Sequence, residues 1–133
     1  PKMALITLVS NDEMSFPVER ALLRHSGTIE NLIANMNLDY PDTDPSTLPI
    51  LIRDVRGEIL EKVIEWLNHH ADDLVGEEDD DEDETVVPDW DLAYLQPYLQ
   101  SGTLLQMANA AKNLDIKKLL KYTCKVIADS FFF

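Results

Sequence analysis

The feature that most constrains this chain is a run of eight consecutive acidic residues, 77–84, between two stretches with helical patterning. Such a block repels itself and has no apolar side chains to bury, so we expect a disordered acidic loop at about residues 74–87. The stretch before the block predicts an amphipathic helix over 57–70. Its apolar residues recur at helical spacing: Ile59, Leu60, Val63, Ile64 and Leu67.

A second helix is predicted immediately after the acidic block. Pro88 ends the loop, and Asp89 or Asp91 can cap a short helix that extends to Leu95. This helix carries Trp90, which we expect to pack at the base of the loop rather than to serve as a platform for a ligand.

The other segments alternate between strands and helices near the N-terminus and are helical thereafter. Residues 4–9 and 14–16 predict a β-hairpin, and Pro17 suits the first turn of a following helix. A third strand is predicted over 48–55, and the last helix is predicted over 116–130. This order predicts an α+β fold, in which a small three-stranded sheet is covered by a helical cluster within a single domain of 133 residues.

The charge balance disfavours several kinds of partner. The formal net charge is −14 at pH 7, which opposes binding to nucleic acid and to an anionic membrane surface. Cys124 is the only cysteine, and no apolar run near the N-terminus has the length of a signal peptide or a transmembrane span. We therefore expect a protein of the cytoplasm and nucleus that binds neither nucleic acid nor a membrane.

No pattern in the sequence predicts catalysis, a cofactor or a metal site. His69 and His70 are adjacent on a helix and point about 100° apart, so they cannot easily share one metal ion. Both imidazoles are expected to be solvated near the end of the helix. Cys124 lies on an apolar helical face, which predicts a small buried hydrophobe rather than a nucleophile. We expect a non-catalytic protein.

The last helix carries apolar side chains around more of its circumference than one small domain needs. Leu120, Cys124 and Ile127 share one face, whereas Leu119 and Val126 lie on other faces. One interpretation is a central core helix that is buried all round. The other interpretation is a helix with one face packed inward and another that awaits a partner.

Four stretches are distinctive in combination: ILEKVIEWLNHHADD (59–73), the acidic block, PDWD (88–91) and NLDIKKLLKYTCKVIAD (113–129). In this order they resemble the Skp-type adaptor subunits of SCF (Skp–cullin–F-box) ubiquitin ligases. The resemblance covers nearly the whole chain and implies a BTB/POZ fold. It also implies the function of a non-catalytic adaptor, which links F-box substrate receptors to a cullin–RING E3 ubiquitin ligase.

The same resemblance implies where the two partners bind. The body of the domain is expected to bind the cullin, and the C-terminal helices are expected to bind the F-box protein. Positions that contact the F-box in the family correspond here to Leu105, Leu120, Cys124 and Ile127.

Two departures from the family pattern modify these expectations. The adaptors usually have Asn-Tyr at the cullin contact where this chain has Lys112-Asn113, so an aromatic anchor is missing. Cullin binding is therefore expected to be weakened, or directed at a different cullin. Family members also continue with helices that close over the F-box, whereas this sequence ends at Phe131, Phe132 and Phe133, so the resemblance is to a C-terminally shortened adaptor.

The sequence also leaves open a second class of function, that of a structural protein rather than an adaptor. The chain could be a structural or self-assembling BTB protein that has lost cullin binding and forms homodimers through its apolar C-terminal face. The pair Lys112-Asn113 favours this alternative, whereas the last helix favours the adaptor.

Deleting residues 77–84 is expected to leave the melting temperature nearly unchanged, because the block has no apolar side chains with which to stabilise a fold. Thermal unfolding followed by circular dichroism measures this. A variant in which the block is replaced by a Gly/Ser segment of the same length controls for the length of the loop. A substantially lower melting temperature in both variants would show that the acidic residues stabilise the fold.

Overall fold

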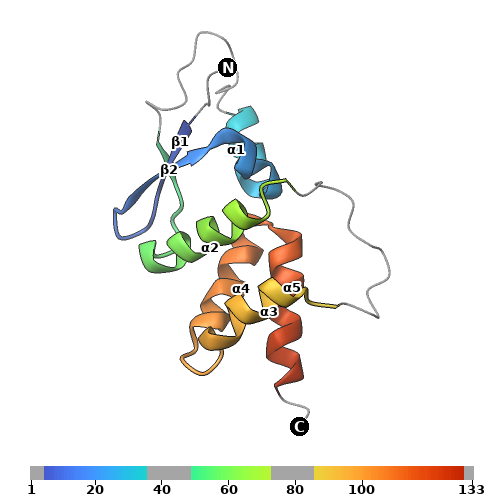
Figure 1. The fold of residues 1–133 in the computed structure, drawn as a ribbon. Coiled ribbons are helices and arrows are strands. Elements are labelled where there is room, and N and C mark those ends of the chain that lie inside the picture. Colours follow the sequence, from blue (N-terminus) through green and yellow to red (C-terminus); the bar gives the residue numbers. More distant parts are fainter. Residues whose placement is uncertain (1–4, 36–48, 73–85, 131–133) are drawn as a thin grey trace.

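The structure is a computed structural model that describes residues 5–35, 49–72 and 86–130 (Figure 1). The predictions for the acidic block (77–84) and for the three terminal phenylalanines (131–133) lie outside the described residues. The elements follow one another in the order β1 (Leu5–Val9), β2 (Ser15–Glu19), the 3-10 helix η1 (Arg20–His25), α1 (Gly27–Asn35), β3 (Ile50–Leu51), α2 (Gly57–His69), α3 (Asp89–Leu95), the 3-10 helix η4 (Gln96–Tyr98), α4 (Thr103–Leu114) and α5 (Lys117–Asp129).

The three strands form one small sheet with the order β2-β1-β3. β1 pairs with β2 in antiparallel fashion and with β3 in parallel fashion, so that Leu8 lies opposite both Phe16 and Ile50. Alternate residues of β1 point to the core, and Ile6 and Leu8 are almost completely buried. The predicted α+β fold with a three-stranded sheet is confirmed.

The prediction that Pro17 begins a helix is wrong. Pro17 lies within β2, where it pairs with Thr7 of β1, and the following 3-10 helix begins only at Arg20. Proline lacks a backbone N–H, but β2 is an edge strand, so one side of its backbone needs no partner in the sheet. The third strand is also shorter than predicted, because the chain turns at Arg53-Asp54 soon after β3.

Helix α2 crosses the middle of the molecule, between the sheet with α1 on one side and α3, α4 and α5 on the other (Figure 1). Four of the five residues of the predicted apolar stripe are buried, whereas Ile64 is only partly buried, and Trp66 is buried in addition. The boundaries of the helix agree with the prediction to within one residue. The largest fully buried side chains come from β1, η1, α1, α2, α3 and α4 and form one core: Ile6, Leu8, Leu23, Ile29, Ile33, Leu60, Trp66, Leu67, Leu95, Leu104 and Met107.

A buried carboxylate joins α2 to α3 across the acidic block. Asp91 was predicted as a possible helix cap, but its side chain turns inward and is only 1% exposed. Its Oδ1 accepts a hydrogen bond of 2.7 Å from Trp66 Nε1, and His70 Nε2 lies 2.8 Å from the same oxygen. The prediction of a solvated imidazole is therefore wrong for His70, because a partner 21 residues along the chain lies over it.

A stack of rings covers the outer side of the same junction. His69 stacks on Trp90 with ring centroids 3.5 Å apart, and Trp90 stacks on Tyr94 at 4.9 Å. Trp90 thus packs at the base of the loop, as predicted. Burial, together with a hydrogen bond to Glu65, raises the pKa of Tyr94, so its hydroxyl stays protonated. The hydroxyl oxygen lies 2.7 Å from Glu65 Oε1 and 2.8 Å from the Lys62 carbonyl oxygen, and its single proton is shared between these two acceptors.

Replacing Asp91 with alanine is expected to lower the free energy of unfolding by about 3 kcal/mol, because the buried N–H groups of Trp66 and His70 would lose their acceptor. Urea unfolding followed by tryptophan fluorescence measures the loss. Asp89→Ala is the matched control, since Asp89 is exposed on the same helix and should change stability by less than about 1 kcal/mol. Equal effects of the two substitutions would contradict a buried anchor at Asp91.

Candidate functional site

The residues predicted to bind partners lie on α4 and α5, which form an antiparallel pair joined by a tight turn (Figure 1). Asp115 adopts a left-handed backbone conformation with φ of 54° and ends α4. Its N–H donates to the Lys112 carbonyl, and the N–H of Ile116 donates to the Ala111 carbonyl. This is a Schellman arrangement, which satisfies carbonyl groups that the end of a helix otherwise leaves unpaired.

The end of α4 is also fastened to the beginning of α1. Ser26 Oγ donates to the Leu114 carbonyl at 2.5 Å, and Thr28 Oγ1 donates to the Asn113 carbonyl at 2.9 Å. The N–H of Gly27 donates to the Asp115 carbonyl at 3.1 Å. These bonds hold the α4–α5 turn against the N-terminal half of the chain.

Helix α5 buries one side only. Leu119, Thr123 and Val126 face the core, and the Thr123 hydroxyl donates to the Leu119 carbonyl at 2.9 Å. Leu120 and Ile127 lie at the border, where they are partly buried and pack against the core. The interpretation of a core helix that is buried all round is therefore wrong.

Cys124 was predicted to be a buried hydrophobe, but it is exposed. Thr123 occupies the inward position, where its hydroxyl donates to the Leu119 carbonyl within the helix. Cys124, the next residue, is rotated away from the core around the helix and is therefore exposed. Leu105 of α4 is also accessible, with 59% of its surface exposed. We call Leu105, Leu120, Cys124 and Ile127 the C-terminal apolar strip.

The strip is spread over two helices. Because α4 and α5 are antiparallel, Leu105 near the start of α4 and Ile127 near the end of α5 lie at the same end of the pair (Figure 1). The strip thus combines two exposed residues with two that are half-buried. Accessible apolar side chains of this kind are typical of a surface that binds a protein.

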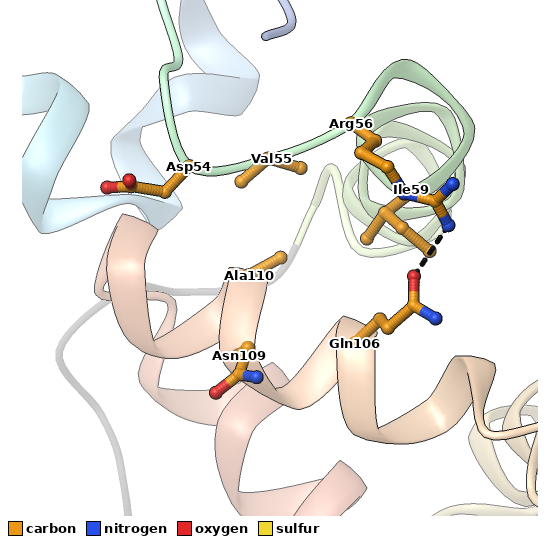
Figure 2. A pocket seen from close by; sticks show the side chains of 7 residues that line it. All are labelled: Asp54, Val55, Arg56, Ile59, Gln106, Asn109 and Ala110. Carbon is orange, nitrogen blue, oxygen red and sulfur yellow. Dashed lines mark hydrogen bonds between the residues drawn. The ribbon is translucent and has the colours of Figure 1, made fainter.

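A second surface lies where α4 meets the loop 53–56 (Figure 2). Two hollows of about 130 Å³ and 220 Å³ share Asp54, and together they follow one row of α4: Gln106, Asn109 and Asn113. We call this surface the α4 groove. The smaller hollow is lined by Asp54, Val55, Arg56, Ile59, Gln106, Asn109 and Ala110, and the larger one by Thr28, Leu32, Leu51, Ile52, Arg53, Asp54, Asn113 and Leu114.

The smaller hollow has an apolar floor and a polar rim. Val55, Ile59 and Ala110 are almost completely buried and form the floor. At one end, Arg56 Nη2 donates to Gln106 Oε1 at 2.7 Å and so bridges the start of α2 to α4 (Figure 2). An apolar floor inside a polar rim is the usual anatomy of a protein-binding surface.

Of the two residues predicted to bind the cullin, Lys112 and Asn113, the structure places only Asn113 in the α4 groove. Asn113 is exposed and lines the larger hollow with Arg53 and Asp54, whereas Lys112 is exposed but lines neither hollow. The sequence analysis missed Gln106 and Asn109. Their signal is a polar row at i, i+3 and i+7 along α4, which ends at Asn113.

Neither a metal site nor a membrane-spanning helix is found in the part of the chain that the structure describes. Within residues 5–35, 49–72 and 86–130, no group of three or more His, Cys, Asp or Glu side chains could hold a metal ion. Among the helices of these same segments, none is long and apolar enough to cross a membrane.

A small three-stranded sheet covered by helices makes this an α+β domain, and its accessible surfaces lie on α4 and α5. The family model described as Skp1 family, tetramerisation domain matches residues 4–72. The chain is 39% identical over 127 residues to the "Skp1-related protein" of Caenorhabditis elegans, which covers 93% of this chain and 70% of that protein. The chain belongs to the Skp1 family.

Two further relatives extend the comparison. The "E3 ubiquitin ligase complex SCF subunit sconC" of Talaromyces stipitatus is 37% identical over 127 residues, with 93% of this chain and 74% of the relative covered. The "SCF ubiquitin ligase complex protein SKP1b" of Dictyostelium discoideum is 35% identical over 130 residues, with 96% and 75% covered. These alignments include α3, α4 and most of α5, which lie beyond the part matched by the family model.

Proposed function

We propose that this chain is an adaptor of an SCF-type ubiquitin ligase, which links an F-box substrate receptor to a cullin. The observation that carries the proposal is the presence of two chemically different surfaces on one domain: the C-terminal apolar strip on α4 and α5, and the α4 groove between α4 and the loop 53–56. Membership of the Skp1 family supports it, as do relatives that are named as SCF subunits.

An adaptor of this kind acts by placement rather than by bond chemistry. Holding a substrate receptor and a cullin on one body raises the effective concentration of the substrate near the ubiquitin-charged enzyme. The gain depends on a fixed geometry between the two partners. The hydrogen bonds of Ser26, Gly27 and Thr28 to the end of α4 supply that rigidity.

The F-box is assigned to the C-terminal apolar strip. Leu105 and Cys124 are accessible without any rearrangement of the core, and Leu120 and Ile127 can extend the contact while they remain packed on their inner sides. Burial of apolar side chains of this size is the main favourable term in most protein–protein contacts.

The cullin is assigned to the α4 groove. Its apolar floor can receive side chains of a partner helix, and its polar rim can fix their register. Asn113 stands at the edge of the larger hollow, where an aromatic side chain would cover more apolar surface. The absence of an aromatic residue at this position is the reason to expect a weaker cullin contact.

Reconstitution tests the adaptor function directly. The full chain, an F-box domain and a cullin N-terminal domain are expected to co-elute as one ternary complex in gel filtration, and the two partners should not co-elute without the chain. A complex with the F-box domain but not with the cullin domain would support F-box binding and contradict cullin binding. The self-assembling alternative stays a prediction, and no observation on the described residues favours it.

Replacing Leu105 with aspartate is expected to weaken F-box binding by about 30-fold, or roughly 2 kcal/mol, without unfolding the domain. Leu105 is a better target than Leu120, because Leu120 also packs against the core. Calorimetric titration with a purified F-box domain measures the affinity. Val86→Asp is the matched control, since Val86 is 77% exposed and belongs to neither surface. Unchanged affinity in L105D would place the F-box elsewhere.

Replacing Asn113 with tyrosine is expected to tighten binding to a cullin N-terminal domain by a factor of about 30, because a new aromatic ring would cover the larger hollow. Calorimetry on the purified pair measures the gain. Asn31→Tyr provides the control, since Asn31 is an exposed asparagine on α1 outside the groove. No gain, or an equal gain in both variants, would show that the cullin does not use this position.

A further inference from the structure

Helix α5 carries an unusual concentration of positive charge for so acidic a chain. Its residues 117–125 include four lysines and no acidic residue, although the whole chain has a net charge of −14. Three of these lysines, Lys117, Lys121 and Lys125, follow one another at i, i+4 and i+8 and therefore form a row along the helix. We call them the lysine row.

The lysine row runs beside the C-terminal apolar strip. At 3.6 residues per turn, Cys124 lies between the Leu120–Ile127 edge of the helix and the lysine row. The lysine row is on the side of α5 opposite Leu119, Thr123 and Val126, which face the core. A partner that covers the apolar strip would consequently extend over the lysines.

The first two lysines of α5 lie where a positive charge is unfavourable for the helix. Lys117 and Lys118 occupy the first turn of α5, and that turn contains no acidic residue. Positive charge at the N-terminus of a helix opposes the helix dipole, so these positions cost stability rather than add to it. The ion pair of Lys125 with Asp129, at 3.2 Å on an exposed surface, contributes little. A local cost of this kind is expected where side chains serve a function.

We propose that the F-box segment bound by this chain carries acidic side chains beside its apolar contact residues, and that these face Lys117, Lys121 and Lys125. The inference rests on the proposed function and adds a selection rule to it: F-box partners with acidic residues facing the lysine row bind more tightly than others. An acidic chain repels acidic partners at long range, so a local positive row would attract them to one place and set their register. Partners with neutral or basic residues at these positions would bind less well.

The test uses the full chain, a panel of purified F-box domains from the genome that encodes it, and the triple variant Lys117→Gln, Lys121→Gln, Lys125→Gln. The domains that bind most tightly are expected to be acidic beside their apolar contacts, and the triple variant should bind them about tenfold more weakly. Added salt should reduce the difference between the variant and the natural chain.

A second triple variant controls for net charge. Asn11→Asp, Ser15→Asp and Asn31→Asp produce the same change in net charge at exposed positions of the N-terminal half, and they should leave F-box affinity within about twofold. The lysine variant should still unfold cooperatively and melt within a few degrees of the natural chain, since the three side chains lie on the side of α5 opposite its core-facing residues.

The outcomes separate this inference from the proposed function. F-box binding that is equally strong in the lysine variant, or equally weakened in both triple variants, overturns the selection rule and leaves the adaptor function intact. Failure of every F-box domain to bind the natural chain overturns the adaptor function, and the selection rule with it.

Discussion

The arrangement of both candidate surfaces depends on how the end of α4 is satisfied. The last carbonyls of a helix need partners when they are covered by other parts of the chain, and here Ser26, Gly27 and Thr28 provide them. The left-handed residue Asp115 then reverses the chain into α5. One cluster of hydrogen bonds to the last carbonyls of α4 therefore positions Asn113 in the α4 groove and sets the direction of the helix that carries most of the apolar strip.

A second anchor explains how an acidic block can be accommodated between α2 and α3. Trp66 and His70 at the end of α2 share the buried carboxylate of Asp91 on α3, and the ring stack of His69 and Trp90 covers the outside. The helices are thus joined by side chains on both flanks of the block. The entropy of closing a chain segment between two fixed ends grows only slowly with its length, so these contacts can hold α2 against α3 over a connection of many residues.

Periodic patterns predicted the helices well, because the apolar spacing of α2 and α5 depends only on neighbouring residues. The same patterns failed where a distant partner decides the outcome. The local sequence predicts Asp91 as a helix cap, but the residue lies buried because Trp66 Nε1 donates a hydrogen bond to its carboxylate. Cys124 reads as buried, yet Thr123 takes the inward position. The α4 groove could not be predicted from local pattern, since Arg56 and Gln106 meet across 50 residues of sequence.

The two surfaces differ in chemistry in a way that suits an adaptor. The α4 groove has an apolar floor within a rim that carries both signs of charge, from Arg53, Asp54 and Arg56. On α5 the apolar strip instead borders a row of lysines. Specificity is a difference between affinities, and it improves when each surface disfavours the partner of the other. A protein that must hold two partners at once needs this distinction, because two similar apolar faces on so small a domain would compete for the same partner.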